Sequence, residues 1–97
     1  MKLRLTRRAA RNLADIADYL RERNPEAALR VRDAIVKSLQ NLALFPQAGR
    51  KQEVEGVRKI VTRRYPYLVY YRTDEVAGEI VIIAIRHSAR EREHSDA

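Results

Sequence analysis

The spacing of apolar residues changes once along this chain, and that change limits the fold more than any other feature. From Ala9 to Phe45, apolar side chains recur every three or four residues, which is the spacing of helices with one buried face. Beyond Pro46, Val, Ile and Tyr dominate three runs whose composition suits pleated strands. A chain with helices first and strands afterwards is predicted to form an α+β domain.

Two helices are predicted, over residues 7–23 and from Pro25 to about Leu44. Thr6 is suited to cap the first helix, while Asn24 and Pro25 end it and begin the second. The connection is so short that the helices are expected to pack as an antiparallel hairpin. The first helix has an apolar stripe, and the second has a stripe and a further apolar line on a neighbouring face: Ala9, Leu13, Ile16, Ala17 and Leu20, then Ala28, Val31, Ile35, Leu39 and Leu42, then Leu29, Val36 and Ala43.

Four strands are predicted, a short one at residues 2–6 and three more at 57–64, 67–73 and 79–87. The run at 80–85 has no polar face, so we expect it to be the central strand and to be covered on both sides. The predicted order is β-α-α-β-β-β: an N-terminal strand flanking a larger sheet, the helical hairpin, and a three-stranded antiparallel sheet. A loop at 47–56 and a frayed tail at 88–97 complete the prediction.

The composition favours one small domain that grips a macromolecular partner. With 97 residues the chain is too short for two domains, so residues 1–97 are expected to form a single one. A net charge of +7 and a pI near 10.2 favour association with nucleic acid or an acidic protein. The absence of cysteine is typical of the reducing cytoplasm, and no stretch is apolar for long enough to enter a membrane. We therefore expect a cytoplasmic protein.

The sequence lacks the residues that most kinds of catalytic or cofactor site need. The two histidines, His87 and His94, have no metal-ligand spacing, so no metal site is expected. The glycines stand apart, so no phosphate loop and no nucleotide cofactor are expected. Ser38 and Ser88 lie in no recognisable nucleophile motif. No cofactor of any kind is predicted.

Basic and tyrosine residues follow the predicted strands and form the remaining candidate site. The guanidinium groups could contact phosphates and the tyrosine rings could stack on bases. The alternative is a solvated sheet face with the tyrosines in the core. The residues concerned are Arg58, Lys59, Arg63, Arg64, Arg72, Arg86, Arg90 and Arg92, with Tyr65, Tyr67, Tyr70 and Tyr71.

Seven short fragments, spread over nearly the whole chain, resemble the ParE/RelE family of toxins from bacterial type II toxin-antitoxin pairs. Each fragment alone is weak, but their order and spacing together are specific. They are LTRRA at 5–9, LADIADYL at 13–20, NP at 24–25, FPQAGR at 45–50, GVR at 56–58, YLVYYR at 67–72 and IAIRH at 83–87.

The resemblance implies a cognate acidic antitoxin, ParD-like, whose C-terminal segment wraps the toxin along the hairpin and the sheet. The spare apolar line on the helices agrees with this, because an acidic amphipathic helix could lie along it. The residues expected to bind the antitoxin are Tyr19, Leu29, Val36, Arg58 and Tyr70.

The family divides in activity, and the sequence favours its ParE-like branch. ParE-like members poison DNA gyrase and have no nuclease constellation. Here the last tyrosine is Tyr71, well before the tail, and the run RHSAR at 86–90 resembles the ParE-type ending. We therefore expect a gyrase poison rather than an enzyme, with Arg86, His87 and Arg90 binding the target.

Two alternatives stay open at this point. RelE-like members resemble ribosome-dependent mRNA endonucleases, in which sheet arginines stabilise phosphate charge and one group assists proton transfer. The corresponding candidates here are Arg58, Arg63, Arg86 and His87. The other alternative is a non-toxic binding module or a decayed toxin.

Overall fold

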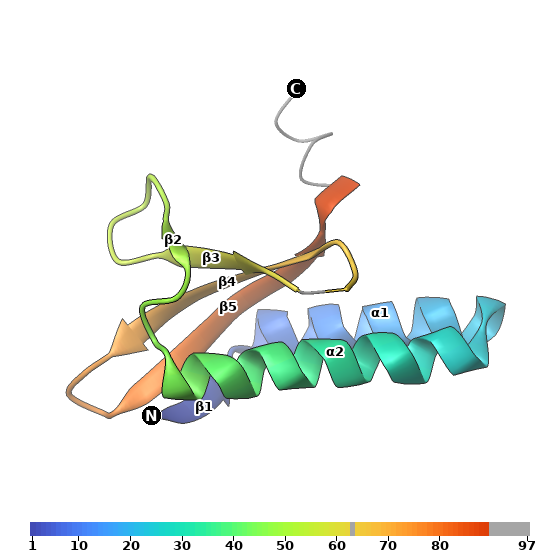
Figure 1. The fold of residues 1–97 in the computed structure, drawn as a ribbon, viewed down its shortest axis with the longest axis horizontal. Helices are drawn as coiled ribbons and strands as arrows, with labels where there is room; N and C mark the ends of the chain where they lie inside the picture. Colours follow the sequence, from blue (N-terminus) through green and yellow to red (C-terminus); the bar gives the residue numbers. More distant parts are fainter. Residues whose placement is uncertain (63, 90–97) are drawn as a thin grey trace.

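Two helices and five strands follow one another in the computed structural model, which describes residues 1–62 and 64–89. The elements are β1 (Lys2–Leu5), α1 (Arg7–Arg23), α2 (Pro25–Leu44), β2 (Arg50–Lys51), β3 (Arg58–Val61), β4 (Tyr67–Asp74) and β5 (Glu79–His87) (Figure 1). None of the helices in the described part of the chain is long and apolar enough to cross a membrane.

The two helices begin and end where the capping residues predict. The side-chain oxygen of Thr6 accepts a hydrogen bond from the Ala9 amide at 3.1 Å, and that of Asn24 accepts one from the Ala27 amide at 3.2 Å. Pro25 occupies the first turn of α2, where its missing N–H costs no hydrogen bond. Asn24 thus ends α1 and starts α2, which confirms the predicted hairpin.

The strands form one mixed sheet in the order β1-β5-β4-β3-β2. β1 pairs in parallel with β5, and the other neighbours are antiparallel. The α+β fold class is confirmed, with two refinements: the predicted loop at 47–56 contains the two-residue β2, and β3 is shorter than the predicted strand at 57–64. β5 is interior and buried on both faces as expected, although β4 holds the middle position.

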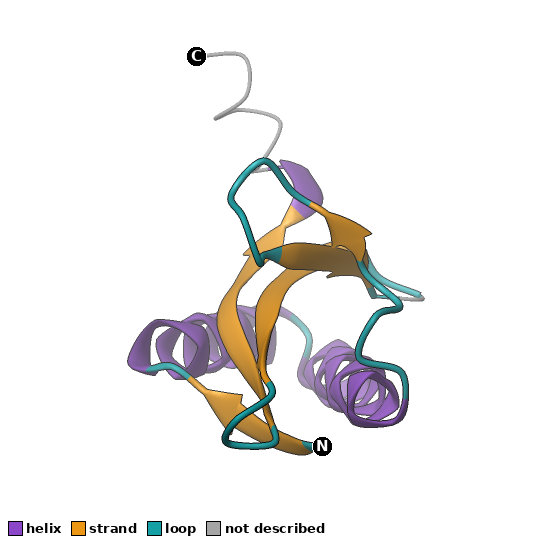
Figure 2. Cartoon of the chain, turned by 90° about the vertical axis from the view of Figure 1, so that its left-hand side faces the viewer, coloured by secondary structure: helices purple, strands orange, loops and turns teal. Residues whose placement is uncertain are grey.

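The hairpin packs against one face of the sheet, here called the inner face. Figure 2, which looks almost along the helices, shows the strands passing between and above them. Alternate residues of β4 and β5 point to this face because successive strand side chains alternate. The core joins them to the helix stripes: Ala9, Val31, Ile35, Leu39 and Leu42 with Tyr67, Val69, Tyr71, Ile80, Ile82 and Ile85.

A bulge in β5 interrupts its pairing with β4. Tyr70 is opposite Ala84, but the next residue, Tyr71, is opposite Ile82, so Ile83 has no partner across β4. The extra residue lets two apolar runs of different phase point to the same core. The bulge therefore places Ile80, Ile82 and Ile85 on the core side although their spacing is not strictly alternate.

Helix α1 completes the edge of β5 beyond the end of β1. The Thr6 hydroxyl donates to the carbonyl of Ile83 at 3.0 Å, and the Asn12 side-chain oxygen accepts from the amide of Ile85 at 3.0 Å. These side chains satisfy backbone groups that a longer β1 would otherwise have paired. The bulge is therefore tied to the helix as well as to the sheet.

Candidate functional site

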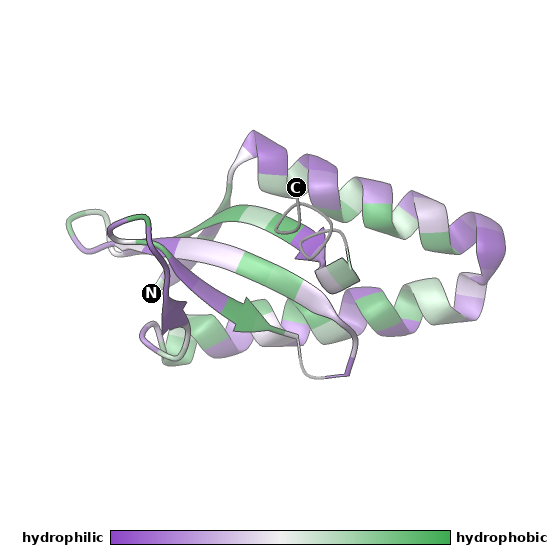
Figure 3. Ribbon diagram, turned by 90° about the horizontal axis from the view of Figure 1, so that it is seen from above, coloured by the Kyte–Doolittle hydropathy of each residue, from purple (hydrophilic) through white to green (hydrophobic). Residues whose placement is uncertain are grey.

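The face of the sheet turned away from the helices, here called the outer face, has a buried apolar floor and a basic rim. The registers place Leu68, Val81 and Ala84 on this face, and all three are buried. Figure 3 views the sheet from this side. The basic residues that the same registers place around the floor are Lys2, Arg4, Arg50, Lys59, Arg72 and Arg86.

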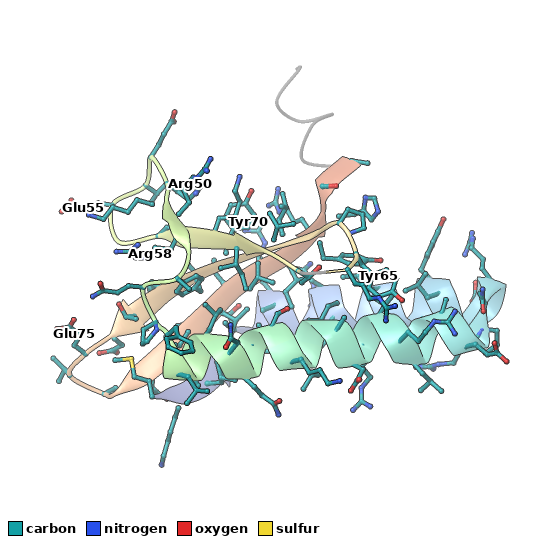
Figure 4. All side chains as sticks on the ribbon, in the orientation of Figure 1. Arg50, Glu55, Arg58, Tyr65, Tyr70 and Glu75 are labelled. Carbon is teal, nitrogen blue, oxygen red and sulfur yellow. The ribbon has the colours of Figure 1, made fainter. Side chains whose placement is uncertain are left out.

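Positive charge exceeds negative charge on the outer face. Among the described strand residues, the registers place two carboxylates there, those of Asp74 and Glu79, and Glu79 pairs with Arg4 at 3.4 Å between Oε1 and Nε. The Lys59 ammonium lies 5.9 Å from the ring centre of half-buried Tyr70, which Figure 4 labels. A cation-rich surface with an accessible ring suits an anionic partner.

Arg86 and His87 are adjacent in sequence but lie on opposite faces at the end of β5. Arg86 is opposite Leu68 on the outer face, whereas His87 is opposite Tyr67 on the inner side. The rings of Tyr67 and His87 meet edge to face, with centres 5.3 Å apart. His87 Nδ1 accepts a hydrogen bond from the Ala89 amide at 3.1 Å, so the neutral ring carries its proton on Nε2.

The fold alters the titration of Tyr67. Burial, and after it the nearby phenol of Tyr19, raise the pKa of Tyr67 above its ordinary value of 10.0. The Tyr67 hydroxyl, a polar group at the edge of the core, therefore keeps its proton to a higher pH than an ordinary tyrosine does.

Arg58 lies on the inner side of the sheet, on β3, whereas Arg86 lies on the outer face of β5. Arg58 is opposite Tyr71, and its guanidinium donates to the carbonyls of Gly49 at 2.8 Å and Gln47 at 3.4 Å. Of the residues predicted for a nuclease, Arg58, Arg86 and His87 are thus spread over both faces of the sheet and over two strands, β3 and β5, that are not neighbours. Arg63 and Arg90 lie outside the described residues.

Tyr71 fixes the loop between α2 and β2, a feature that the sequence did not reveal. Its buried hydroxyl donates to the carbonyl of Pro46 and accepts from the amide of Gly49, both at 2.8 Å. Gly49 is required here because a Cβ at this position would lie 2.6 Å from that hydroxyl oxygen. In the sequence, the run FPQAGR at 45–50 was the only indication of this contact, because it joins the end of the second helix to Gly49.

The apolar line predicted on the hairpin forms a shallow groove on α2. Leu29, which is 68% exposed, and half-buried Val36 line it together with Arg30, Arg32 and Asp33, around a volume of about 470 Å³. Tyr19 is exposed on α1, as many residues before Asn24 as Leu29 is after it. The Arg23 guanidinium lies 3.8 Å from the centre of the Tyr19 ring.

The five residues predicted to bind an antitoxin therefore divide into two groups. Leu29 and Val36 line the groove on α2, and Tyr19 is exposed on α1. Tyr70 is on the outer face of the sheet, and the Arg58 guanidinium is hydrogen-bonded to the loop carbonyls. In residues 1–62 and 64–89, no three His, Asp or Glu side chains are grouped so as to hold a metal ion.

Solved toxins of type II toxin-antitoxin pairs have this fold. The chain superposes on one from the chromosomal ParDE system of P. aeruginosa with a TM-score of 0.77 and 34% identity, covering 90% of this chain and 95% of that one. A chain of the RelBE2 toxin-antitoxin complex from Mycobacterium tuberculosis matches with a TM-score of 0.63 and 26% identity, covering 89% and 95%. The isolated E. coli RelE toxin, at 17% identity and a TM-score of 0.63, shares the fold.

The sequence places the chain within that class. Residues 3–92 match the model of the ParE toxin of the type II toxin-antitoxin system parDE. The Sinorhizobium fredii protein named "Putative toxin Y4kP" is 31% identical over 87 residues, which cover 90% of this chain and 88% of that protein. The chain belongs to the ParE toxin family, and it is a ParE-like toxin of a type II toxin-antitoxin system.

Proposed function

We propose that this toxin acts by binding and inhibiting DNA gyrase, and that an acidic antitoxin neutralises it by laying an amphipathic helix on the hairpin. The proposal treats the chain as a binding protein and not as a nuclease. The target-binding residues are Arg86, His87 and Arg90, and the antitoxin-binding residues begin with Tyr19, Leu29 and Val36.

The observation that carries the choice of gyrase is the separation of the nuclease candidates. Phosphodiester cleavage needs its acid-base group and its charge-stabilising groups around one reacting phosphate. Arg58 is hydrogen-bonded to loop carbonyls on the inner side, whereas Arg86 is on the outer face of β5 and His87 faces Tyr67. This dispersion favours a mechanism that relies on contact surface alone.

The groove on α2 supports the antitoxin half of the proposal. It exposes Leu29 beside Arg30 and Arg32, so an acidic helix would find both an apolar line and opposite charge there. Asp33, which also lines the groove, forms an ion pair with Lys37 of the same helix at 3.1 Å. This pair is exposed, so it is weak and is screened by salt.

The target is tested with purified toxin and gyrase in a supercoiling assay. We expect the toxin to abolish supercoiling and the double variant R86A/R90A to lose that effect while still binding the antitoxin. Unimpaired supercoiling at saturating toxin would overturn the gyrase target.

Pulse labelling after induction of the toxin in cells separates gyrase inhibition from mRNA cleavage. Early loss of DNA synthesis is expected, because gyrase inhibition stops replication first. Early loss of protein synthesis would support the ribosome-dependent nuclease instead. No arrest of either process would leave a non-toxic binding module.

Two exposed leucines of α2 provide a matched test of the antitoxin surface. Leu29 and Leu44 are 68% and 74% exposed, so an aspartate at either position leaves the core intact. We expect L29D to weaken antitoxin binding about tenfold or more by repelling an acidic helix, and L44D to leave it unchanged. V36D is expected to act as L29D does, with thermal melting as the check on folding. Equal loss for L29D and L44D would count against the α2 groove.

A further inference from the structure

The first fourteen side chains of the protein carry positive charge only. They include five basic residues and no acidic one, and the first carboxylate along the chain is that of Asp15. The five basic side chains are all exposed and are here called the basic band: Lys2, Arg4, Arg7, Arg8 and Arg11. The band follows β1 at the edge of the sheet and continues into the first two turns of α1 (Figure 2). Ordinary protein surfaces mix the two signs, so a segment of one sign indicates an anionic partner.

The arginines of α1 are placed where they lower the stability of the helix. Arg11 follows Arg7 by four residues and Arg8 by three, and these spacings bring side chains together on a helix surface. Like charges so placed repel, and cations in a first turn also oppose the helix dipole. The first turn of α1 has no acidic residue, and none of the three arginines forms an ion pair with a described residue. Fold stability therefore does not explain their arrangement.

The two halves of the basic band border the same edge of the sheet. The registers place Lys2 and Arg4 on the outer face, with Cα atoms about 7 Å apart along β1. On α1, the hydrogen bond from the Ile85 amide to Asn12 fixes the side of the helix that borders β5. Arg8 comes one turn before Asn12 and is therefore on that side. The band thus passes from the outer face, around the end of β1, to the exposed surface of α1.

Negative charge close to the basic band is smaller than its positive charge. Arg4 pairs with Glu79 at 3.4 Å, and Asp74 lies opposite Glu79. Asp15 follows the band on α1. The N-terminal ammonium and Glu75 line the same groove beside the end of α2, so these two charges offset each other. Five cations of the band therefore meet three carboxylates of the described residues, one of which is already paired.

The basic band offers charge without an apolar anchor. Leu3, Leu5 and Ala9 alternate with its basic residues, and all three pack inward against the core. Protein interfaces have an apolar centre that is depleted of charged residues, whereas a phosphate backbone is held largely by cations. Four of the five cations are arginines, whose guanidinium groups match phosphate oxygens in pairs. The band therefore suits a chain of phosphates better than an acidic protein helix.

We propose that the basic band binds the phosphate backbone of nucleic acid without reading its sequence. Each guanidinium or ammonium group pairs with phosphate oxygens and releases counterions, so the affinity falls steeply with salt. The band is distinct from the residues assigned to the target, because β1 pairs with β5 only as far as Ile82 and Arg86 comes four residues later. The proposal stands independently of gyrase and of the antitoxin.

The test measures binding of the full chain to fluorescent probes by anisotropy, between about 50 and 200 mM salt. The probes are a short duplex DNA, a single-stranded RNA of equal length and polyglutamate. We expect both nucleic acids to bind with a steep salt dependence and polyglutamate to bind far more weakly. Binding of one nucleic acid alone would support the proposal and identify which backbone is held. No binding at the lowest salt, or equally tight binding of polyglutamate, would overturn it.

Two double variants of equal charge separate the basic band from the total charge of the protein. R8Q/R11Q should weaken nucleic-acid binding about tenfold or more and lower the salt slope by about 2, because two phosphate contacts are lost. R21Q/K37Q removes the same charge from exposed positions elsewhere on the hairpin and should leave both quantities nearly unchanged. Equal losses in the two variants would show that binding follows total charge, and would overturn the proposal.

A third variant and thermal melting separate lost contacts from lost folding. R8K/R11K keeps the charges and should keep most of the affinity. R8Q/R11Q should melt no lower than the native chain, because it removes repulsion between neighbouring arginines. An R8K/R11K variant that folds but binds as weakly as R8Q/R11Q would contradict binding through charge.

Discussion

The inner and outer faces of the sheet use the same kind of residue for different tasks. Arg58 and Lys59 are adjacent in sequence but face opposite sides, because strand side chains alternate. Arg58 donates to the carbonyls that anchor the loop after α2, whereas Lys59 lies over the ring of Tyr70 on the open face. Strand position, rather than residue type, decides whether a basic side chain supports the fold or is left to meet a partner.

The largest loss of stability is expected on the inner face, when one carbon is added at Gly49. A Cβ there would lie 2.6 Å from Tyr71 Oη and 3.0 Å from the carbonyl oxygen of Lys59, which is backbone and cannot yield easily. We expect G49A to lower the free energy of unfolding by about 3 kcal/mol, the upper end of overpacking costs. Urea unfolding followed by circular dichroism measures it, and a loss below about 0.5 kcal/mol would show that the loop relaxes freely.

Removing only the hydroxyl of Tyr71 should cost less. Y71F leaves the Gly49 amide and the Pro46 carbonyl without their partner, and we expect a loss of about 2 kcal/mol in unfolding free energy. The same hydroxyl is the nearest obstacle to G49A, so G49A should cost less in the Y71F background than in the native one. Strict additivity in this double-mutant cycle would contradict the contact.

Substituting the adjacent residues Arg58 and Lys59 in turn tests the difference between the two faces of the sheet. R58A removes the guanidinium from two loop carbonyls, and we expect a loss of about 1 kcal/mol in stability, because solvent reaches part of the site. K59A should change stability by less than about 0.5 kcal/mol. The same unfolding experiment compares both, and an equal cost would mean that the two faces do not differ in this way.

The smallest effect is expected at high pH. Because burial raises the pKa of Tyr67, the folded state keeps the phenolic proton at a pH where the unfolded state has lost it. The stability that depends on this proton is fully present below about pH 10 and declines as the pH rises through the folded-state pKa. Y67F should flatten the decline above pH 10, and an unchanged alkaline profile would show that another group causes it.

The helices could be predicted closely because their signals are local. Thr6, Asn24 and Pro25 act within a few residues, and the predicted bounds of the first helix match α1. The outward line of Leu29 and Val36 followed from helical spacing in the same way. Local sequence therefore accounts for the hairpin and for its exposed groove.

The sheet contacts depended on pairings between distant residues, which the sequence pattern does not encode. The parallel pairing of β1 with β5 joins the two ends of the chain, and the bridge from Tyr71 to Gly49 spans 22 residues. The pattern placed Arg58 on a strand but could not say which face it would share with Tyr71. The contact of Asn12 with β5 could not be predicted either, since a polar residue on an amphipathic helix normally faces water.

The bonds from Thr6 and Asn12 to β5 also bear on self-association. A strand with unpaired N–H and C=O groups is a template on which further chains can stack, edge to edge. Along the second half of β5, helix side chains fill that role, so no incoming strand can pair there. A protein that extends this sheet is therefore left with the free edge of β1 or, on the opposite side of the sheet, the edge beside β2 and β3.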